Sequence, residues 1–166
     1  MLIEHSKLLY AIQQAGQVVG RKKLQKIIYI SKKCQYDFQQ KYNFHFFGPY
    51  SEELSLQIEE LTNLGFIQEV KETKSGYSQY NYELSDKGKE YLEVYPIEME
   101  RYQSFVHDLN EQSSRFLELV STMLYFDKLE QEALFQKVAK VKAKQNYTDE
   151  EMDRAFVYIK QLRAVN

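Results

Sequence analysis

The chain lacks the features that would direct it out of the cytoplasm. It has a single cysteine, Cys34, so no disulfide can form within the chain. No stretch approaches the ~18 consecutive apolar residues of a membrane-spanning helix, and residues 1–5 lack the cationic segment and apolar run of a signal peptide. With 43% hydrophobic and 28% charged residues, the 166-residue chain should still fold around a core. We therefore expect a globular cytoplasmic protein that does not enter a membrane.

Motifs of metal and catalytic chemistry are also missing. His5, His45 and His107 do not stand at the spacing of metal ligands on a helix, and Cys34 has no cysteine partner nearby. The six glycines are scattered, so there is no phosphate-binding loop, and no Gly-x-Ser-x-Gly motif occurs. His45 could act as a general base, but local spacing fixes no nucleophile or carboxylate beside it, which favours a half-exposed histidine at a strand end. The sequence predicts no metal, no cofactor and no enzymatic activity.

Charge is distributed unevenly along the chain. Residues 1–50 contain eight lysines or arginines and two carboxylates, whereas residues 51–100 contain four lysines and twelve carboxylates. The remaining residues contain ten of each sign, so the net charge of −2 conceals a dipolar molecule. An electrostatic partner would therefore recognise one side of the protein.

Two helices are predicted before residue 35. The first spans residues 2–15 and ends near Gly16. The second spans residues 21–34 and shows the period of an amphipathic helix. The residues expected on its buried side are Leu24, Ile27, Ile28, Ser31 and Cys34. The residues expected on its exposed, basic side are Lys22, Lys26, Tyr29 and Lys33.

The next segment predicts a strand, a helix and a hairpin. Residues 42–47 favour a short strand or ordered loop that a turn at Gly48 and Pro49 would end. Ser51 is a suitable cap for a third helix, which Gly65 would terminate. The buried stripe expected on that helix is Leu54, Ile58 and Leu61. The two strands of the hairpin are expected at 66–72 and 78–84, and a fourth helix at 86–94, capped by Ser85.

This order of elements resembles the winged-helix fold. Asn63-Leu64-Gly65-Phe66-Ile67, the hairpin, and residues 82–92 look like the end of the recognition helix, the wing and the exit helix of bacterial winged-helix proteins. Residues 23–29 and 46–54 are similar to the YwgA-like bacterial family and, more distantly, to the SocA-like (Panacea) antitoxin domain. The resemblance implies a winged-helix domain over residues 1–95 and a regulatory, antitoxin-like role in binding another protein.

Residues 96–166 predict a helical extension. Beyond Pro96 the sequence contains no glycine or proline, and its apolar residues recur at helical spacing in four segments. Thr148 and Glu151 form a capping box for the last of these helices. The connections are short, so we expect these helices to pack on the first domain or to form a homodimer interface. The fold class is therefore mainly α with a small β-hairpin.

Two surfaces are candidates for binding. The third helix would expose Glu52, Leu56, Glu59, Glu60 and Asn63. An apolar side chain surrounded by carboxylates is typical of a protein interface. The carboxylates would also repel the phosphates of DNA. The second helix offers a basic surface for an acidic partner or nucleic acid, formed by Arg21, Lys22, Lys23, Lys26, Tyr29 and Lys33. Protein binding through the third helix is the preferred interpretation; the alternative is a transcriptional regulator that contacts DNA through the second helix and the wing.

Further basic and aromatic residues leave another alternative open. Lys137, Lys140 and Lys144 form a second basic stripe on a predicted C-terminal helix. Aromatic residues that could stack on the bases of single-stranded nucleic acid are Phe44, Phe46, Phe47, Tyr50, Tyr77, Tyr80 and Tyr82. For the aromatic residues at alternating positions, packing between the hairpin and the third helix is the favoured interpretation. Each basic surface could also be an ordinary solvent-exposed face that binds nothing.

Overall fold

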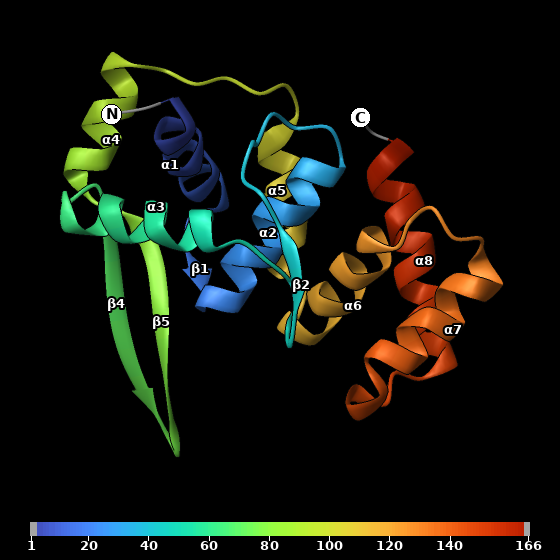
Figure 1. Cartoon of the computed structure of the whole chain (residues 1–166). Helices are drawn as coiled ribbons and strands as arrows, with labels where there is room; N and C mark the ends of the chain where they lie inside the picture. Colours follow the sequence, from blue (N-terminus) through green and yellow to red (C-terminus); the bar gives the residue numbers. More distant parts are fainter. Residues whose placement is uncertain (1–2, 165–166) are drawn as a thin grey trace.

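A computed structural model describes residues 3–164 of the chain (Figure 1). Residue 2, predicted to start the first helix, lies outside this range. The protein is mainly helical, as the sequence predicted, and contains two small antiparallel sheets where one hairpin was expected. The elements are α1 (Ile3–Ala15), β1 (Val18–Val19), α2 (Arg21–Lys33), β2 (Asn43–His45), β3 (Gly48–Tyr50), α3 (Glu52–Asn63), β4 (Ile67–Lys74), β5 (Tyr77–Leu84), α4 (Asp86–Val94), α5 (Tyr102–Glu111), α6 (Ser114–Tyr125), α7 (Gln131–Val141), the 3₁₀ turn η1 (Ala143–Gln145) and α8 (Asp149–Ala164). None of the helices within residues 3–164 is long and apolar enough to cross a bilayer.

The larger sheet contains the predicted hairpin and one strand that the sequence did not indicate. β4 and β5 pair antiparallel, with Ile67 opposite Leu84, and extend away from the helices (Figure 1). β1, only two residues long, adds to the free edge of β5, where Val18 lies opposite Tyr82. The order across the sheet is therefore β1, β5, β4. Strand pairing joins the connection between α1 and α2 to the base of the hairpin.

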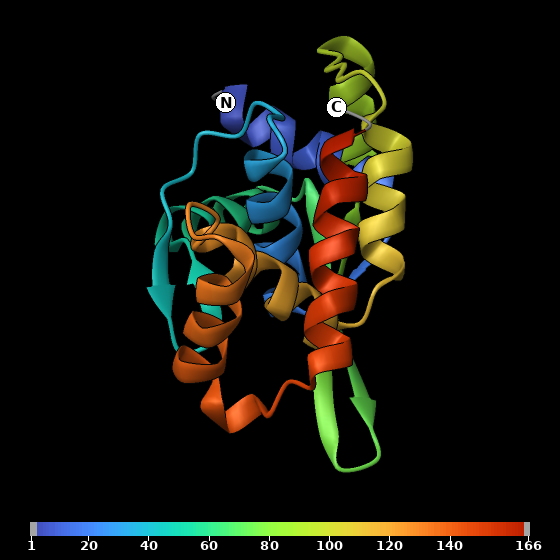
Figure 2. The same ribbon diagram turned by 90° about the vertical axis from the view of Figure 1, so that its right-hand side faces the viewer.

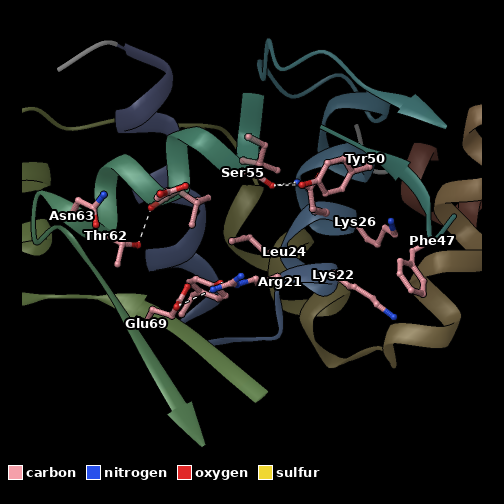
Figure 3. A pocket seen from close by; sticks show the side chains of 15 residues that line it. Arg21, Lys22, Leu24, Lys26, Phe47, Tyr50, Ser55, Thr62, Asn63 and Glu69 are labelled. Atoms are coloured by element: carbon pink, nitrogen blue, oxygen red, sulfur yellow. Dashed lines mark hydrogen bonds and ion pairs between the residues drawn. The ribbon is translucent and has the colours of Figure 1, made fainter. Parts of the chain in front are cut away.

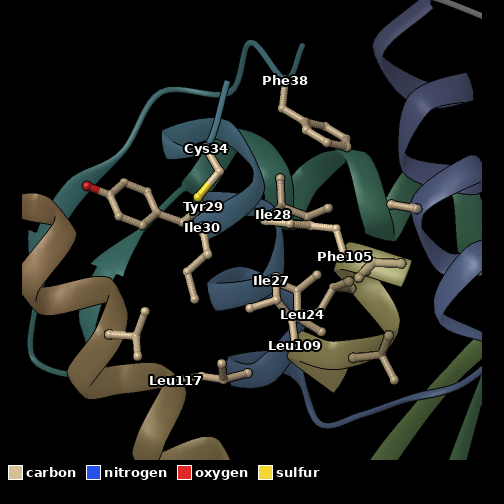
Figure 4. Close-up of a cluster of buried hydrophobic side chains, with 14 of the residues drawn as sticks. Leu24, Ile27, Ile28, Tyr29, Ile30, Cys34, Phe38, Phe105, Leu109 and Leu117 are labelled. Atoms are coloured by element: carbon tan, nitrogen blue, oxygen red, sulfur yellow. The ribbon is translucent and has the colours of Figure 1, made fainter. Parts of the chain in front are cut away.

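Helix α2 is buried on all sides between Leu24 and Ser31, which corrects the predicted exposure of Lys26 and Tyr29, whereas Lys22 is exposed as predicted. Every residue from Leu24 to Ser31 is buried. α5 and α6 pack against this helix, and β1 and β3 also contact it (Figure 4). Lys26 and Tyr29 are therefore inside the protein, where Tyr29 packs edge-to-face on Tyr42. The expected burial of Leu24, Ile27, Ile28, Ser31 and Cys34 is confirmed.

A second hairpin replaces the single strand predicted at residues 42–47. β2 turns at Phe46 and Phe47 and returns as β3, so Gly48 and Pro49 begin a strand and do not form the turn. Gly48 adopts a φ of 92°, which favours glycine. A Cβ atom at this position would also lie 3.4 Å from Thr122 Oγ1 of α6. The hairpin therefore packs beside α6 with its glycine in a conformation that other residues rarely adopt.

The predicted helix ends are confirmed by their local hydrogen bonds. Ser51 Oγ accepts from the Leu54 amide at the start of α3, and Ser85 Oγ accepts from the Gly88 amide at the start of α4. Gly65 follows α3 with a φ of 82°. At the start of α8, the Glu151 amide donates to Thr148 Oγ1 while the Thr148 amide donates to Glu151 Oε1. The predicted buried stripe of α3, formed by Leu54, Ile58 and Leu61, is also buried.

The C-terminal helices pack on the N-terminal part of the chain. α5 contacts α1 and α2, and α6 contacts α2 and β3. Tyr102 of α5 is fully buried, and its hydroxyl lies 2.9 Å from Ser31 Oγ of α2. α7 and α8 pack on the outer side of α6 (Figure 2). The division of the chain into domains at residue 95, and a homodimer, stay predictions.

Gly88 gives a test of how α4 packs on the larger sheet. Alanine normally stabilises a helix relative to glycine by about 1 kcal/mol. A Cβ atom at Gly88, however, would lie 2.3 Å from the carbonyl oxygen of Phe66. We expect Gly88→Ala to lower the free energy of unfolding by about 1–3 kcal/mol, because α4 must move away from β4. Urea unfolding measures this change, with the exposed Lys89→Ala as control; a stabilised Gly88→Ala would contradict the packing.

Truncation after Tyr95 tests whether the C-terminal helices belong to the folded unit. It would expose the side of α2 that α5 and α6 cover, including the contact between Ser31 and Tyr102. We expect residues 1–95 to aggregate or to melt at a markedly lower temperature than the full chain, since a large apolar surface becomes exposed. Size-exclusion chromatography and thermal melting report the result. A monomeric fragment as stable as the full chain would show that residues 96–166 are an independent module.

Candidate functional site

A cavity of about 530 Å³ lies between α2, α3, the β4–β5 hairpin and the tip of the β2–β3 hairpin (Figure 3). Its floor is apolar and comes from Leu24 of α2 with Leu54 and Ile58 of α3. The other side chains that line it are Arg21, Lys22, Gln25, Lys26, Phe47, Tyr50, Ser55, Glu59, Thr62, Asn63, Glu69 and Tyr82. The cavity thus has an apolar floor and polar walls from several separate segments.

The cations of this cavity do not converge on one point. Arg21 Nε donates to the hydroxyl of Tyr82 at 2.8 Å, and the Arg21 guanidinium lies 3.1 Å from Glu69 Oε1. Lys22 Nζ lies 3.5 Å from the centre of the Phe47 ring. Lys26 Nζ donates to a backbone carbonyl of β3. Figure 3 shows these side chains directed along different walls, so the cavity is not a preformed pocket for one small anion.

The cavity brings together residues that the sequence assigned to two different surfaces. Arg21, Lys22 and Lys26 were predicted on a basic face, and Glu59 and Asn63 on an acidic one, yet all five line the same cavity. The remaining predicted residues of α2 lie elsewhere. Lys23 donates to the carbonyl of Asn110, Lys33 lies 3.2 Å from Asp127, and Tyr29 is buried.

The outer face of α3 is exposed and acidic. Leu56 is 59% exposed, and Glu52, Glu59, Glu60 and Asn63 are exposed along the same helix. Glu60 already has a hydrogen-bond partner within the fold, because its carboxylate lies 2.7 Å from Nε2 of the buried His5. α3 contains no lysine or arginine. The face therefore offers an apolar side chain among carboxylates that have no cation on the same helix.

A buried charged cluster fixes the β2–β3 hairpin. Lys26 Nζ donates to the Pro49 carbonyl at 2.9 Å, and Lys142 Nζ donates to the Phe46 carbonyl at 2.8 Å. Lys142 also lies 3.1 Å from Glu118 of α6. Burial lowers the pKa of Lys26 to about 8, an effect that the charge of Glu118 partly opposes. Two lysines far apart in the sequence thus hold the two sides of one hairpin turn.

Several residues of the cavity and the cluster were missed from the sequence. Glu69 and Tyr82 belong to the β4–β5 hairpin, whose alternation predicted the strands but gave no sign of contact with Arg21. Glu118 lies within an apolar helical pattern, and Lys142 lies beside a predicted basic stripe. No local motif distinguishes Glu118 or Lys142, because their partners come from distant segments of the chain.

The structure does not bring the cysteine or the histidines into a catalytic or metal-binding arrangement within residues 3–164. Cys34 is buried, and burial raises the pKa of its thiol to about 11, which disfavours the reactive thiolate. His5 lies on α1, His45 on β2 and His107 on α5. Within residues 3–164, no three His, Cys, Asp or Glu side chains come together as metal ligands would. The absence of a metal and of enzymatic activity stays a prediction.

The pH dependence of stability tests the buried position of Lys26. Its pKa in the folded state is about 8, whereas an unfolded lysine titrates near ~10.4. Between these values the unfolded state binds more protons, so wild-type stability rises with pH. We expect a rise of about 1 kcal/mol between about pH 7 and about pH 9 that Lys26→Met lacks, measured by urea unfolding. The exposed Lys89→Met should retain the rise; an identical pH dependence in wild type and Lys26→Met would contradict the assignment.

Comparison with known proteins places the chain in a family. No protein-family model matches the sequence. A protein of Bacillus subtilis (strain 168), the uncharacterized protein YwgA, is 54% identical over 165 residues, which cover 99% of this chain and 99% of the relative. Identity of this level over the full length means that the two chains share their fold and the greater part of their core. The chain therefore belongs to the YwgA family.

Proposed function

We propose that this chain is a non-enzymatic cytoplasmic regulator or adaptor whose winged-helix domain, residues 1–95, binds another protein through the acidic face of α3. The order α1, β1, α2, α3, β4, β5, with the β2–β3 hairpin inserted between α2 and α3, and the wing-like β4–β5 hairpin support the winged-helix assignment. The distant similarity to SocA-like (Panacea) antitoxin domains supports a protein partner. The proposal depends most on one observation, the exposed Leu56 surrounded by carboxylates on α3.

The charge of α3 favours a protein partner over DNA. A winged helix that reads DNA usually places its third helix in the major groove. Here Glu52, Glu59 and Glu60 would face the phosphates, and each carboxylate at a distance of about 6 Å would cost about 0.7 kcal/mol in water before screening. An apolar group with a polar rim is instead the usual anatomy of a protein interface. A partner with a basic surface and an apolar recess would match this face.

The alternative proposal, a transcriptional regulator that contacts DNA through α2 and the wing, has less support. Two of its predicted contacts, Lys26 and Tyr29, are buried. Arg21 is paired with Glu69 at the base of the wing. Among the lysines of α2 only Lys22 is exposed, so this helix offers little positive charge for tight binding to duplex DNA.

Two substitutions on α3 test the protein-binding proposal. Leu56→Asp removes the exposed apolar group, and Glu59→Lys reverses a carboxylate that has no ion pair within residues 3–164. We expect each to weaken binding to the partner found by affinity purification with the wild-type chain by about thirtyfold, a typical loss for a central interface residue. Isothermal titration calorimetry with the purified partner measures the change.

Glu90→Lys on α4 is the matched control, because Glu90 is also an exposed helical carboxylate but does not belong to α3. It should leave the affinity for the partner unchanged. A mobility-shift assay with duplex DNA tests the alternative proposal of DNA binding. A wild-type chain that binds a defined duplex tightly, and loses that binding in Glu59→Lys, would replace the protein-binding proposal with the DNA-binding one.

A further inference from the structure

The tip of the β2–β3 hairpin exposes two adjacent aromatic rings. Phe46 is 70% exposed and Phe47 is 43% exposed, and their ring centres lie 5.0 Å apart in an edge-to-face arrangement. The other aromatic side chains of this hairpin are used in packing: Phe44 lies against Tyr125, and Tyr50 stacks on His45. Packing within the fold therefore accounts for Phe44 and Tyr50 but leaves Phe46 and Phe47 facing solvent.

Lysines from two other segments flank these rings. Lys22 Nζ of α2 lies 3.5 Å from the centre of the Phe47 ring. Lys144 Nζ of η1 lies 5.8 Å from the centre of the Phe46 ring. Figure 2 shows the hairpin beside the end of α7 that leads into η1. Lys22, Phe47, Phe46 and Lys144 thus form one continuous surface, which we name the Phe46–Phe47 platform.

The segments that build the platform contain no carboxylate. Residues 20–33, 38–51 and 133–148 include neither aspartate nor glutamate. Neither Lys22 nor Lys144 forms an ion pair with another residue of the described range, 3–164. Below the platform, the buried cluster contains two lysines and a single glutamate, Glu118. The local charge is therefore positive although the whole chain is slightly acidic.

The platform is held in place before any ligand binds. Lys142 Nζ donates to the Phe46 carbonyl, and Lys26 Nζ donates to the Pro49 carbonyl. Both ammonium groups are buried, and Gly48 between these carbonyls lies against α6. A hairpin tip anchored in this way loses little conformational entropy on binding.

We propose that the Phe46–Phe47 platform binds a short segment of single-stranded nucleic acid. Exposed aromatic rings stack on unpaired bases of any sequence, and flanking lysines contact the phosphates on either side. A duplex does not suit this surface, because its bases are already stacked and paired. The platform uses other side chains than the exposed face of α3, although Lys22 and Phe47 share the cavity with Glu59 and Asn63, so the proposal does not depend on the proposed protein partner.

Fluorescence anisotropy with a labelled oligothymidylate of about 12 nucleotides tests the proposal. We expect the full chain to bind it at low salt, and Phe46→Ala to weaken binding about tenfold or more through loss of one stacked base. The double variant Lys22→Glu, Lys144→Glu should weaken binding and lower the salt slope by about 1.4, at about 0.7 for each phosphate contact. Tyr95→Ala and Lys89→Glu, exposed on or beside α4, are matched controls and should bind like wild type.

Three outcomes would overturn the proposal. The first is no binding of the oligothymidylate at about 50 mM salt, where electrostatic contacts are strong. The second is equal binding of an abasic oligonucleotide of the same length, which would show attraction to phosphates without stacking. The third is Phe46-dependent binding to vesicles of anionic phospholipid without binding to the oligonucleotide, which would assign the platform to a membrane surface. Phe46 is exposed, so thermal melting of Phe46→Ala should match wild type and separate loss of binding from loss of fold.

Discussion

The burial of α2 on every side is the constraint on which the rest of the structure depends. Between Leu24 and Ser31 the helix has no solvent-exposed residue, because α5, α6 and β3 all pack against it. The C-terminal helices therefore complete the core that the N-terminal helices begin. Substitutions between Leu24 and Ser31 are consequently changes to the core, even where the residue replaced is Lys26.

Burying Lys26 has consequences for the surface as well as for the core. A buried ammonium is costly unless it is hydrogen-bonded, and the Pro49 carbonyl satisfies it here. Lys142 likewise donates a hydrogen bond to the Phe46 carbonyl, and its charge is paired with that of Glu118. The hydrogen bonds that satisfy the buried lysines also hold the hairpin tip, so a requirement of the core determines where Phe46 and Phe47 are presented to solvent.

The uneven charge of the chain becomes two separate faces in three dimensions. Carboxylates gather on α3, while the platform at the hairpin tip is built from segments without any carboxylate. The cavity lies between them and contains side chains of both signs. The proposed protein partner and the proposed nucleic acid would therefore meet surfaces of opposite charge.

The sequence by itself determined those features that depend on neighbouring residues. Ser51, Ser85 and the pair Thr148 and Glu151 start helices through hydrogen bonds within one turn, and alternation along residues 78–84 predicted strand β5. The 54% identity with YwgA over 165 residues then confirmed the family that residues 23–29 and 46–54 had suggested.

Only the tertiary structure decided which side of each element meets solvent. The period of α2 placed Lys26 opposite Ile27 and Ile28, but it could not show that α6 and β3 cover that side as well. The turn was predicted at Gly48 and Pro49 but lies at Phe46 and Phe47, because Gly48, with a φ of 92°, begins a strand that packs beside α6. Helical and strand periods report one face of one segment, whereas burial and site geometry arise from contacts between segments far apart in the chain.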